Sequence, residues 1–203
     1  MHEAVSTDVA NPYAAPEHLG SAEVAGTSSR FYVVAPRKFL ILFIGTLGLY
    51  LLYWMYAHWA CFRRATKGSE WPVARAIFGV FFVHSLFAEI DLSLRRTGSS
   101  LRWSPGSSAT WAVVLMIVNT VSDRMAARSV GSPVTDLLGL AMVFVLPFPL
   151  LEAQRAANAA CGDPEGAGNS EMTAANIAWL VLGVVLWALT VLGTLVVLGV
   201  VEG

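Results

Sequence analysis

The chain has 203 residues, of which 56% are hydrophobic and 13% are charged, whereas about 25% of the residues of a typical soluble domain are charged. This composition excludes a disordered chain, and two cysteines are too few for a disulfide scaffold. The formal net charge of −1 leaves no basic field that could hold a nucleic acid, so none is expected as a partner. So apolar a composition leaves too little polar surface to cover a water-soluble globule, and the expected partner is therefore a lipid bilayer.

Residues 1–30 are predicted to form a disordered acidic tail. Carboxylates and small residues dominate this segment, and no Lys or Arg precedes Arg30, so the segment has nothing with which to bury a core. A secretory signal peptide would need a basic start and a short apolar region. This chain instead begins polar and acidic, and its first apolar segment is too long, so we expect that segment to be an uncleaved anchor.

Residues 31–203 are predicted to form an all-α membrane protein, a polytopic bundle of about five helices of which four or five span. A helix needs about 20 apolar residues to cross a bilayer core of about 30 Å. The windows 39–62 and 177–201 contain 24 and 25 residues without a charge, and each passes this test alone. The predicted helices have the approximate bounds 38–62, 72–94, 108–127, 133–152 and 173–201.

Two interpretations remain open for the second helix, 72–94. It could span, with its acidic residues at the far end, or it could lie flat on the membrane. Residues 77–83 are apolar on every side apart from Gly79, whereas a helix in the membrane plane should show a wide cationic face. The pattern mildly favours a spanning helix.

The next two helices are conditional spans. The helix 108–127 crosses only if Asp123 lies near the headgroups. The helix 133–152 is apolar over most of its length, but Pro147 and Pro149 should kink or end it, because each removes a backbone donor.

The end of the first predicted helix carries a cluster of aromatic residues. These residues point in nearly all directions and occupy about 14 Å of helix length, which is typical of an interfacial aromatic belt and less typical of a cation-binding cage. The predicted belt consists of Tyr50, Tyr53, Trp54, Tyr56 and Trp59.

The same segment carries a resemblance. From Thr46 to Trp59 the sequence reads Thr-x-Gly-x-Tyr-x-x-Tyr-Trp-x-Tyr-x-x-Trp, which resembles a signature of small, uncharacterised bacterial multipass inner-membrane proteins. The lead-in Pro36-Arg37-Lys38-Phe39 and the string Asn11-Pro12-Tyr13-Ala14-Ala15-Pro16 are similar to motifs of such proteins. The resemblance implies a multipass protein of the bacterial inner membrane, and it implies no catalytic or binding residue.

Polar residues within the apolar helices are the candidates for chemistry. An ionisable group inside a membrane is costly and often functional, and a histidine in such a sector could relay protons. The structural alternative is stronger: Asp91 pairs with Arg95 at the water boundary, and a neutral His84 bonds to a neighbouring helix. The candidate intramembrane polar site comprises His84, Ser85, Glu89, Asp91, Asn119 and Asp123.

These observations leave two functional hypotheses. The sequence contains no catalytic motif and no Cys/His cluster with metal-binding spacing, so we predict a non-enzymatic protein without a cofactor. It would act through helix packing, either as a homo-oligomer or with an unidentified membrane partner. The alternative is a small transporter or proton-coupled permease subunit that uses the polar sector of the second helix.

The cations do not decide the sidedness of the predicted bundle. With five spans and a cytoplasmic N-terminus, seven Lys and Arg residues fall inside and six outside. Orientation normally follows a clear cytoplasmic excess of cations. If the helix 72–94 lies flat instead, the seven cations from Arg63 to Arg102 gather in one cytoplasmic loop and the N-terminus lies outside. We favour the cytoplasmic N-terminus because cations flank the start of the first apolar helix.

Overall fold

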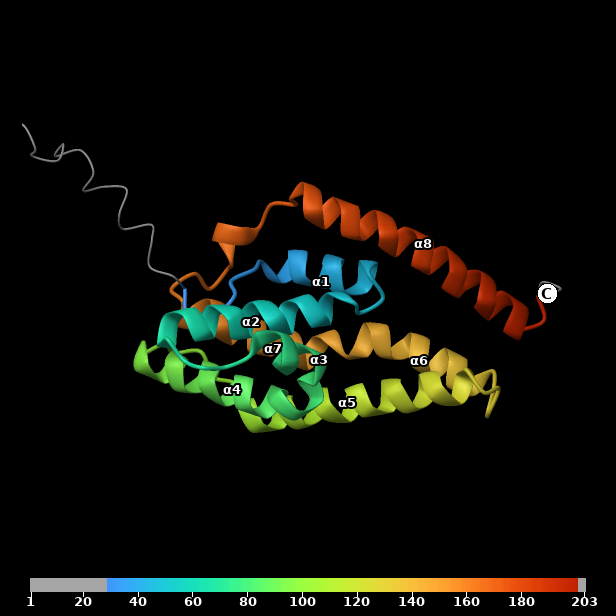
Figure 1. The fold of residues 1–203 in the computed structure, drawn as a ribbon, viewed down its shortest axis with the longest axis horizontal. Helices are drawn as coiled ribbons and strands as arrows, with labels where there is room; N and C mark the ends of the chain where they lie inside the picture. The colour runs from blue at the N-terminus through green and yellow to red at the C-terminus, as the bar shows by residue number, and fades with distance from the viewer. Residues whose placement is uncertain (1–28, 201–203) are drawn as a thin grey trace, which may run out of the picture.

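The structure, a computed structural model, describes residues 29–200, which form a bundle of helices with no strand in that range (Figure 1). The all-α prediction is confirmed for this part of the chain, whereas the predicted tail lies outside it except for its last two residues. The helices are α1 (Pro36–Gly45), α2 (Tyr50–Thr66), α3 (Pro72–Ile77), α4 (Gly79–Arg96), α5 (Pro105–Ala126), α6 (Val134–Val145), α7 (Pro147–Ala160), the 3-10 helix η3 (Ala167–Asn169) and α8 (Ala174–Val197).

The prediction of one continuous helix over 38–62 is wrong, because the chain reverses between α1 and α2 to form a helical hairpin (Figure 1). Leu47 and Gly48 adopt left-handed backbone conformations, with φ of 52° and 82°, and such residues end a helix. The Thr46 hydroxyl donates to Leu42 O at 2.7 Å and accepts from Tyr50 N at 3.0 Å. One side chain thus satisfies backbone groups of both helices at the reversal.

The predicted helix 72–94 is also divided, into the short α3 and the longer α4. The break lies at Phe78, whose φ of −95° and ψ of 34° are not helical, and Gly79 begins α4. The Arg75 guanidinium of α3 lies over the ring of Trp59, 4.0 Å from its centroid, so α3 packs against α2.

The fourth predicted helix is interrupted at Leu146, directly before Pro147, as its prolines predict, and it then continues eight residues beyond the predicted 152. Pro147 and Pro149 lie in the first turn of α7, where a missing backbone N–H costs little. Leu146, between α6 and α7, keeps helical angles of −58° and −34°. The fifth helix ends at Val197, just before the described range ends, while α5 closely matches its predicted bounds.

Two helical stretches among residues 29–200 are long and apolar enough to cross a membrane, Val134–Ala160 and Ala174–Val197. The first is α6 and α7 together, and the second is α8. The four or five spans expected from the sequence are therefore not reproduced on this criterion. The division of the first apolar segment explains part of the difference, because neither α1 nor α2 keeps its full length.

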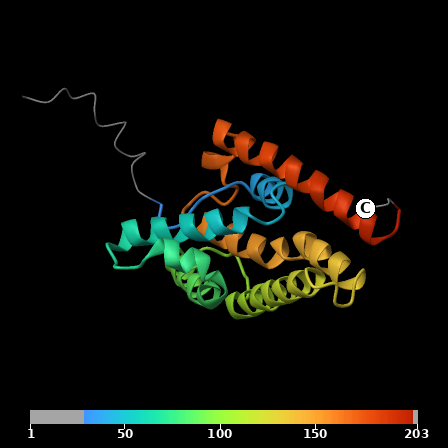
Figure 2. The same ribbon diagram turned by 45° about the vertical axis from the view of Figure 1, so that its right-hand side comes forward.

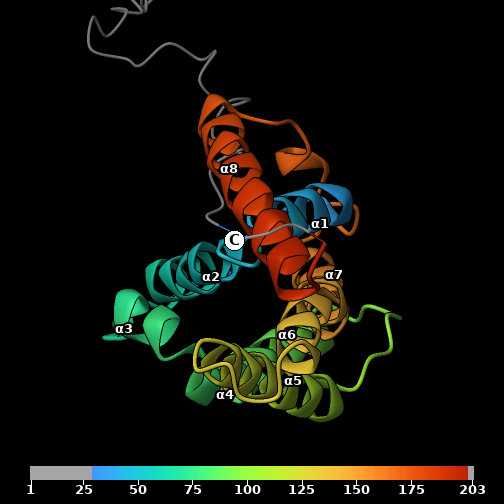
Figure 3. The same cartoon turned by 90° about the vertical axis from the view of Figure 1, so that its right-hand side faces the viewer.

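The core lies where α1, α2, α4 and α7 meet, whereas α8 lies along α1 at one edge of the bundle (Figures 2 and 3). Two glycines permit this contact: Gly183 of α8 lies directly against the carbonyl of Gly45, where a Cβ atom would have no room. Further along α8, Trp187 Nε1 donates to Ile44 O at 2.9 Å.

Candidate functional site

The most extensive polar cluster of the described chain is buried between α2 and α7. Gln154 is fully buried, and its Oε1 accepts from Trp54 Nε1 at 2.6 Å. His58 Nε2 lies 3.2 Å from the same oxygen. The Gln154 Nε2 group donates to Tyr32 O at 2.9 Å and to Asn158 Oδ1 at 2.7 Å. One amide thereby joins two helices to the segment before α1.

Asn158 extends this cluster, because its side-chain amide bonds the backbone of Val34 in the way that a neighbouring β-strand would. Its Nδ2 donates to Val34 O at 2.9 Å, and its Oδ1 accepts from Val34 N at 3.2 Å. Asn169 adds a donated bond to Val33 O at 2.9 Å, and its Oδ1 accepts from Lys38 Nζ at 2.6 Å. The extended segment before α1 therefore finds its hydrogen-bond partners on α7 and on the loop that follows.

We assign a structural role to this cluster. Buried backbone polar groups need partners, and these side chains supply them where no helix or strand can. The cluster is absent from the sequence-based predictions, although a signal for it exists: Trp54 with His58 and Gln154 with Asn158 each have the spacing i,i+4, which places two polar groups on one helix face.

The aromatic-belt prediction needs correction for three of its five members. Trp54 and Trp59 are fully buried, and Tyr50 is 7% exposed, so their rings pack in the core and cannot reach a headgroup layer. Tyr53 and Tyr56 are 50% and 42% exposed and remain compatible with the belt. The five side chains point to different sides of α2, and other helices cover only part of its circumference, so some of them are buried and others are exposed.

Five residues of α4 line one surface pocket of about 450 Å³ together with the start of α5. Four of them, His84, Ala88, Asp91 and Arg95, share a helix face as the sequence predicts, and Leu92 is the fifth. His84 is exposed, and its Nε2 lies 3.2 Å from Thr110 Oγ1 of α5. The predicted bond from His84 to a neighbouring helix is thus present.

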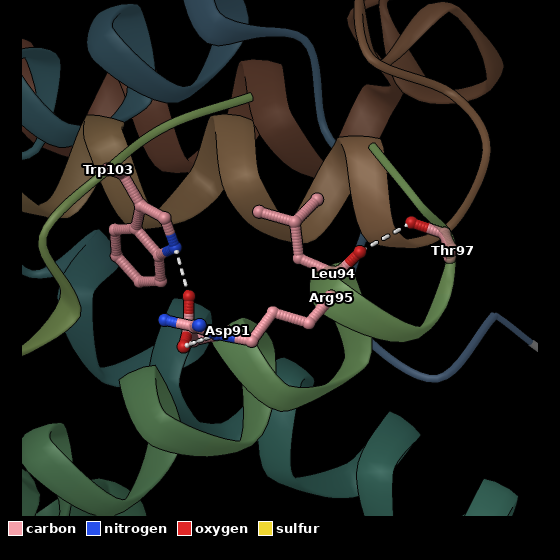
Figure 4. A network of polar contacts seen from close by, with 5 residues as sticks. All are labelled: Asp91, Leu94, Arg95, Thr97 and Trp103. Carbon is pink, nitrogen blue, oxygen red and sulfur yellow. Dashed lines mark hydrogen bonds and ion pairs between the residues drawn. The ribbon is translucent and has the colours of Figure 1, made fainter. Parts of the chain in front are cut away.

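Asp91 is bonded on both of its oxygens (Figure 4). Arg95 Nε donates to Asp91 Oδ2 at 2.7 Å, and Trp103 Nε1 donates to Asp91 Oδ1 at 3.1 Å. The Trp103 ring also packs against Phe87, with a centroid distance of 5.6 Å. The expected Asp91–Arg95 pair therefore also anchors the loop between α4 and α5.

The remaining candidates do not join this pocket. Ser85 is exposed, and Glu89 Oε2 lies 3.5 Å from Arg30 Nη2 near the start of the described chain. Asn119 Nδ2 donates to Asp123 Oδ2 at 2.8 Å within α5. Asn119 lies nine residues beyond Thr110, about 14 Å along the helix, so the six polar candidates form separate groups.

A comparison with family models, curated proteins and solved structures gives no match. The resemblance of the Thr46–Trp59 segment to bacterial inner-membrane proteins therefore stays an expectation. Within residues 29–200, no group of three or more His, Cys, Asp or Glu side chains could hold a metal ion.

Cations gather at one end of the bundle. Arg37, Ser99 and Arg155 line one pocket, and the Arg30 guanidinium lies 5.1 Å from the Phe62 ring centroid. The start of α1 and the ends of α2, α4 and α7 therefore share this end, on the left of Figure 1. Ten of the thirteen Lys and Arg residues belong to it: Arg30, Arg37, Lys38, Arg63, Arg64, Lys67, Arg95, Arg96, Arg102 and Arg155. We call it the cationic end.

Proposed function

We propose that this chain is an integral membrane protein of non-enzymatic character that acts through helix packing. The observation that carries the proposal is α8, whose 24 residues include no charge and only one buried residue, Gly183. Leaving one large apolar side chain in water costs about 1.5–3 kcal/mol relative to burial. Lipid removes that cost along the whole helix, so a bilayer is the environment that suits α8.

The cationic end gives the proposal an orientation. Only Arg124 and Arg128 lie at the opposite end, beside the α5–α6 connection, and Arg75 lies between the ends on α3. Cytoplasmic loops carry an excess of cations, so the cationic end faces the cytoplasm. Five spans would divide the Lys and Arg residues almost equally between the two sides, whereas here ten lie at one end and two at the other. The difference arises because α1 and α2 form a hairpin, which returns residues 63–67 to the end where α1 begins.

This orientation implies a specific topology. The α1–α2 hairpin and the α3–α4 pair enter from the cytoplasmic side and return to it. The elements α5, α6–α7 and α8 connect the two ends, and at 1.5 Å per residue their 22, 27 and 24 residues cover about 33–40 Å, enough for a bilayer core of about 30 Å. The C-terminal end of α8 then lies outside the cytoplasm.

Single cysteines test this topology in intact bacterial cells, in a Cys61→Ala, Cys161→Ala background. We expect a membrane-impermeant thiol reagent to label Ser129→Cys directly and to label Lys67→Cys and Ser99→Cys only after permeabilisation. Lys67→Cys discriminates most sharply, because five spans would place it outside. Direct labelling of Lys67→Cys, or release of the protein from membranes without detergent, would overturn the proposal.

The open face of α8 gives the proposed packing role a physical basis. A Cβ atom added at Gly193 would meet no side-chain or backbone atom within 4 Å, and Val184 and Leu189 are 69% and 61% exposed. A small residue on an open helix allows another helix to approach closely. Gly193→Cys should therefore form a disulfide-linked dimer between two copies in membranes, whereas Leu180→Cys, on the side of α8 that faces Gly45 of α1, should not.

A permease subunit remains the second candidate, because His84, Asp91 and Arg95 line a common pocket. Proton-coupled transport would require water to reach His84. An impermeant thiol reagent should then modify His84→Cys from one side of the membrane. Failure of labelling from both sides would eliminate this candidate and leave the packing role unaffected.

A further inference from the structure

A groove of about 770 Å³ lies between α5 on one side and α6–α7 on the other. On α5 its lining residues run from Ser104 to Leu115, and on the opposite wall they run from Arg155 to Val145. The two walls are antiparallel, so their polar ends coincide at the cationic end and their apolar ends coincide deeper in the bundle. The groove therefore changes from charged to apolar along its length.

The charged mouth is formed by Arg102 and Arg155, which are both exposed. Two ion pairs occur among residues 29–200, and neither contains one of these arginines. Trp103, the residue that follows Arg102, is bonded to Asp91 of α4 and so fixes the backbone next to this arginine (Figure 4). Two guanidinium groups at one mouth suit a phosphate, since arginine binds phosphate oxygens in a bidentate manner.

One carboxylate also lines the groove. Glu152 Oε2 accepts a hydrogen bond from the buried Ser108 Oγ at 2.5 Å, so this carboxylate joins the two walls one turn below Arg155. With two arginines and one glutamate the lining carries a formal charge of +1. That charge complements a headgroup with a net charge of −1 better than a neutral, zwitterionic headgroup.

Below Glu152 the walls are apolar. Trp111 and Phe148 are 61% and 67% exposed into this region, and Leu115 and Val145 form its deep end. Leu115 lies seven residues beyond Ser108, so this apolar part is about 10 Å deep along the helix. That depth is about two-thirds of one leaflet of a bilayer core of about 30 Å, so it covers the upper part of one acyl chain.

We propose that this groove binds an anionic glycerophospholipid, with its phosphate between Arg102 and Arg155 and one acyl chain along Trp111 and Phe148. The proposal rests on the proposed membrane location, which places the cationic end in the cytoplasmic headgroup layer. Basic pockets between helices on that side bind anionic headgroups. The occupant is a lipid, because a soluble phosphate would leave the apolar two-thirds of the groove unfilled.

Native mass spectrometry of the full chain in detergent, titrated with phosphatidylglycerol or phosphatidylcholine of the same acyl chains, tests the proposal. We expect phosphatidylglycerol to bind at least tenfold more tightly than phosphatidylcholine. The Arg102→Gln, Arg155→Gln double variant should lose this preference, whereas the matched Arg124→Gln, Arg128→Gln variant at the opposite end should keep it. Leu115→Trp should weaken the binding of both lipids, because the larger side chain fills the apolar part of the groove.

Three outcomes would overturn the proposal. They are equal affinity for the two lipids, an undiminished preference in the Arg102→Gln, Arg155→Gln variant, and displacement of phosphatidylglycerol by millimolar inorganic phosphate, which would identify a site for soluble phosphate. The single variants Arg102→Gln and Arg155→Gln provide the same readout if the double variant does not fold. These measurements in detergent are independent of cysteine labelling in cells, so a lipid result leaves the topology test intact.

Discussion

The helices α7 and α8 both belong to apolar stretches long enough to cross a membrane, yet their surroundings differ completely. Nine of the 14 residues of α7 are buried, against one of the 24 residues of α8. Gln154 and Asn158 bind α7 to two other segments, whereas α8 rests on α1 through a glycine contact and the Trp187 hydrogen bond. Hydropathy therefore identifies membrane-compatible helices but does not indicate which of them form the core.

The largest effect is expected from removing a polar group of α7. Asn158→Leu would leave Val34 N and Val34 O buried without partners, at about 1–3 kcal/mol each, so the free energy of unfolding should fall by about 3 kcal/mol. Denaturant unfolding in detergent measures this loss. The matched variant Asn119→Leu removes only a bond to the exposed Asp123 and should cost less than about 1 kcal/mol. Equal losses in the two variants would show that the α7 network does not stabilise the core.

A smaller effect is expected where α8 meets α1. Gly183→Val places a Cβ atom against the Gly45 carbonyl, and overpacking of this kind costs about 1–3 kcal/mol. We expect α8 to separate from α1, so that Trp187 fluorescence changes while the unfolding of the remaining core does not. Gly193→Val should change neither property, since a Cβ atom at Gly193 meets open space. Unaltered Trp187 fluorescence in Gly183→Val would contradict the close contact.

The smallest effect concerns the loop that links α7 to α8. Backbone N–H groups of Gly168 and Ala167 bond to the Asp163 carboxylate and hold its pKa below the usual value. A lowered folded-state pKa makes the ionised form stabilising above the unfolded-state pKa of about 3.9, and this contribution disappears as pH falls through the lower folded-state value.

Amide hydrogen exchange of Ala167 and Gly168 measures this dependence between pH 6 and pH 3. The native loop should lose protection at the acidic end, and Asp163→Asn should show weaker protection with little change over that range. Glu165→Gln serves as the control and should behave like the native chain. An acid-independent protection in the native loop would exclude the ionised Asp163 as its cause.

The sequence predicts these regions unequally, for physical reasons. Stretches without charges identify α5 and α8 to within a few residues, because a helix that crosses a membrane depends on local composition. The reversal at Thr46–Leu49 is harder to predict, since Leu47 is a non-glycine residue in a left-handed conformation. Such a conformation is rare and depends on the packing of both helices.

Site residues are predictable only where both partners are local. The Asp91–Arg95 pair is separated by four residues and follows from helix geometry. Gln154 and Trp54 are 100 residues apart, so no periodicity relates them. The charge-to-apolar gradient of the α5–α7 groove likewise requires knowledge of which helix faces meet.

The bonds of the segment before α1 also constrain the order of events during synthesis. Val34 is separated from its partner Asn158 by 124 residues. The ribosome must therefore complete α7 before this segment can dock, and until then the N–H and C=O groups of Val34 lack these partners. Contacts of such long sequence separation slow folding. The earliest segment of the described chain is thus among the last to reach its final position.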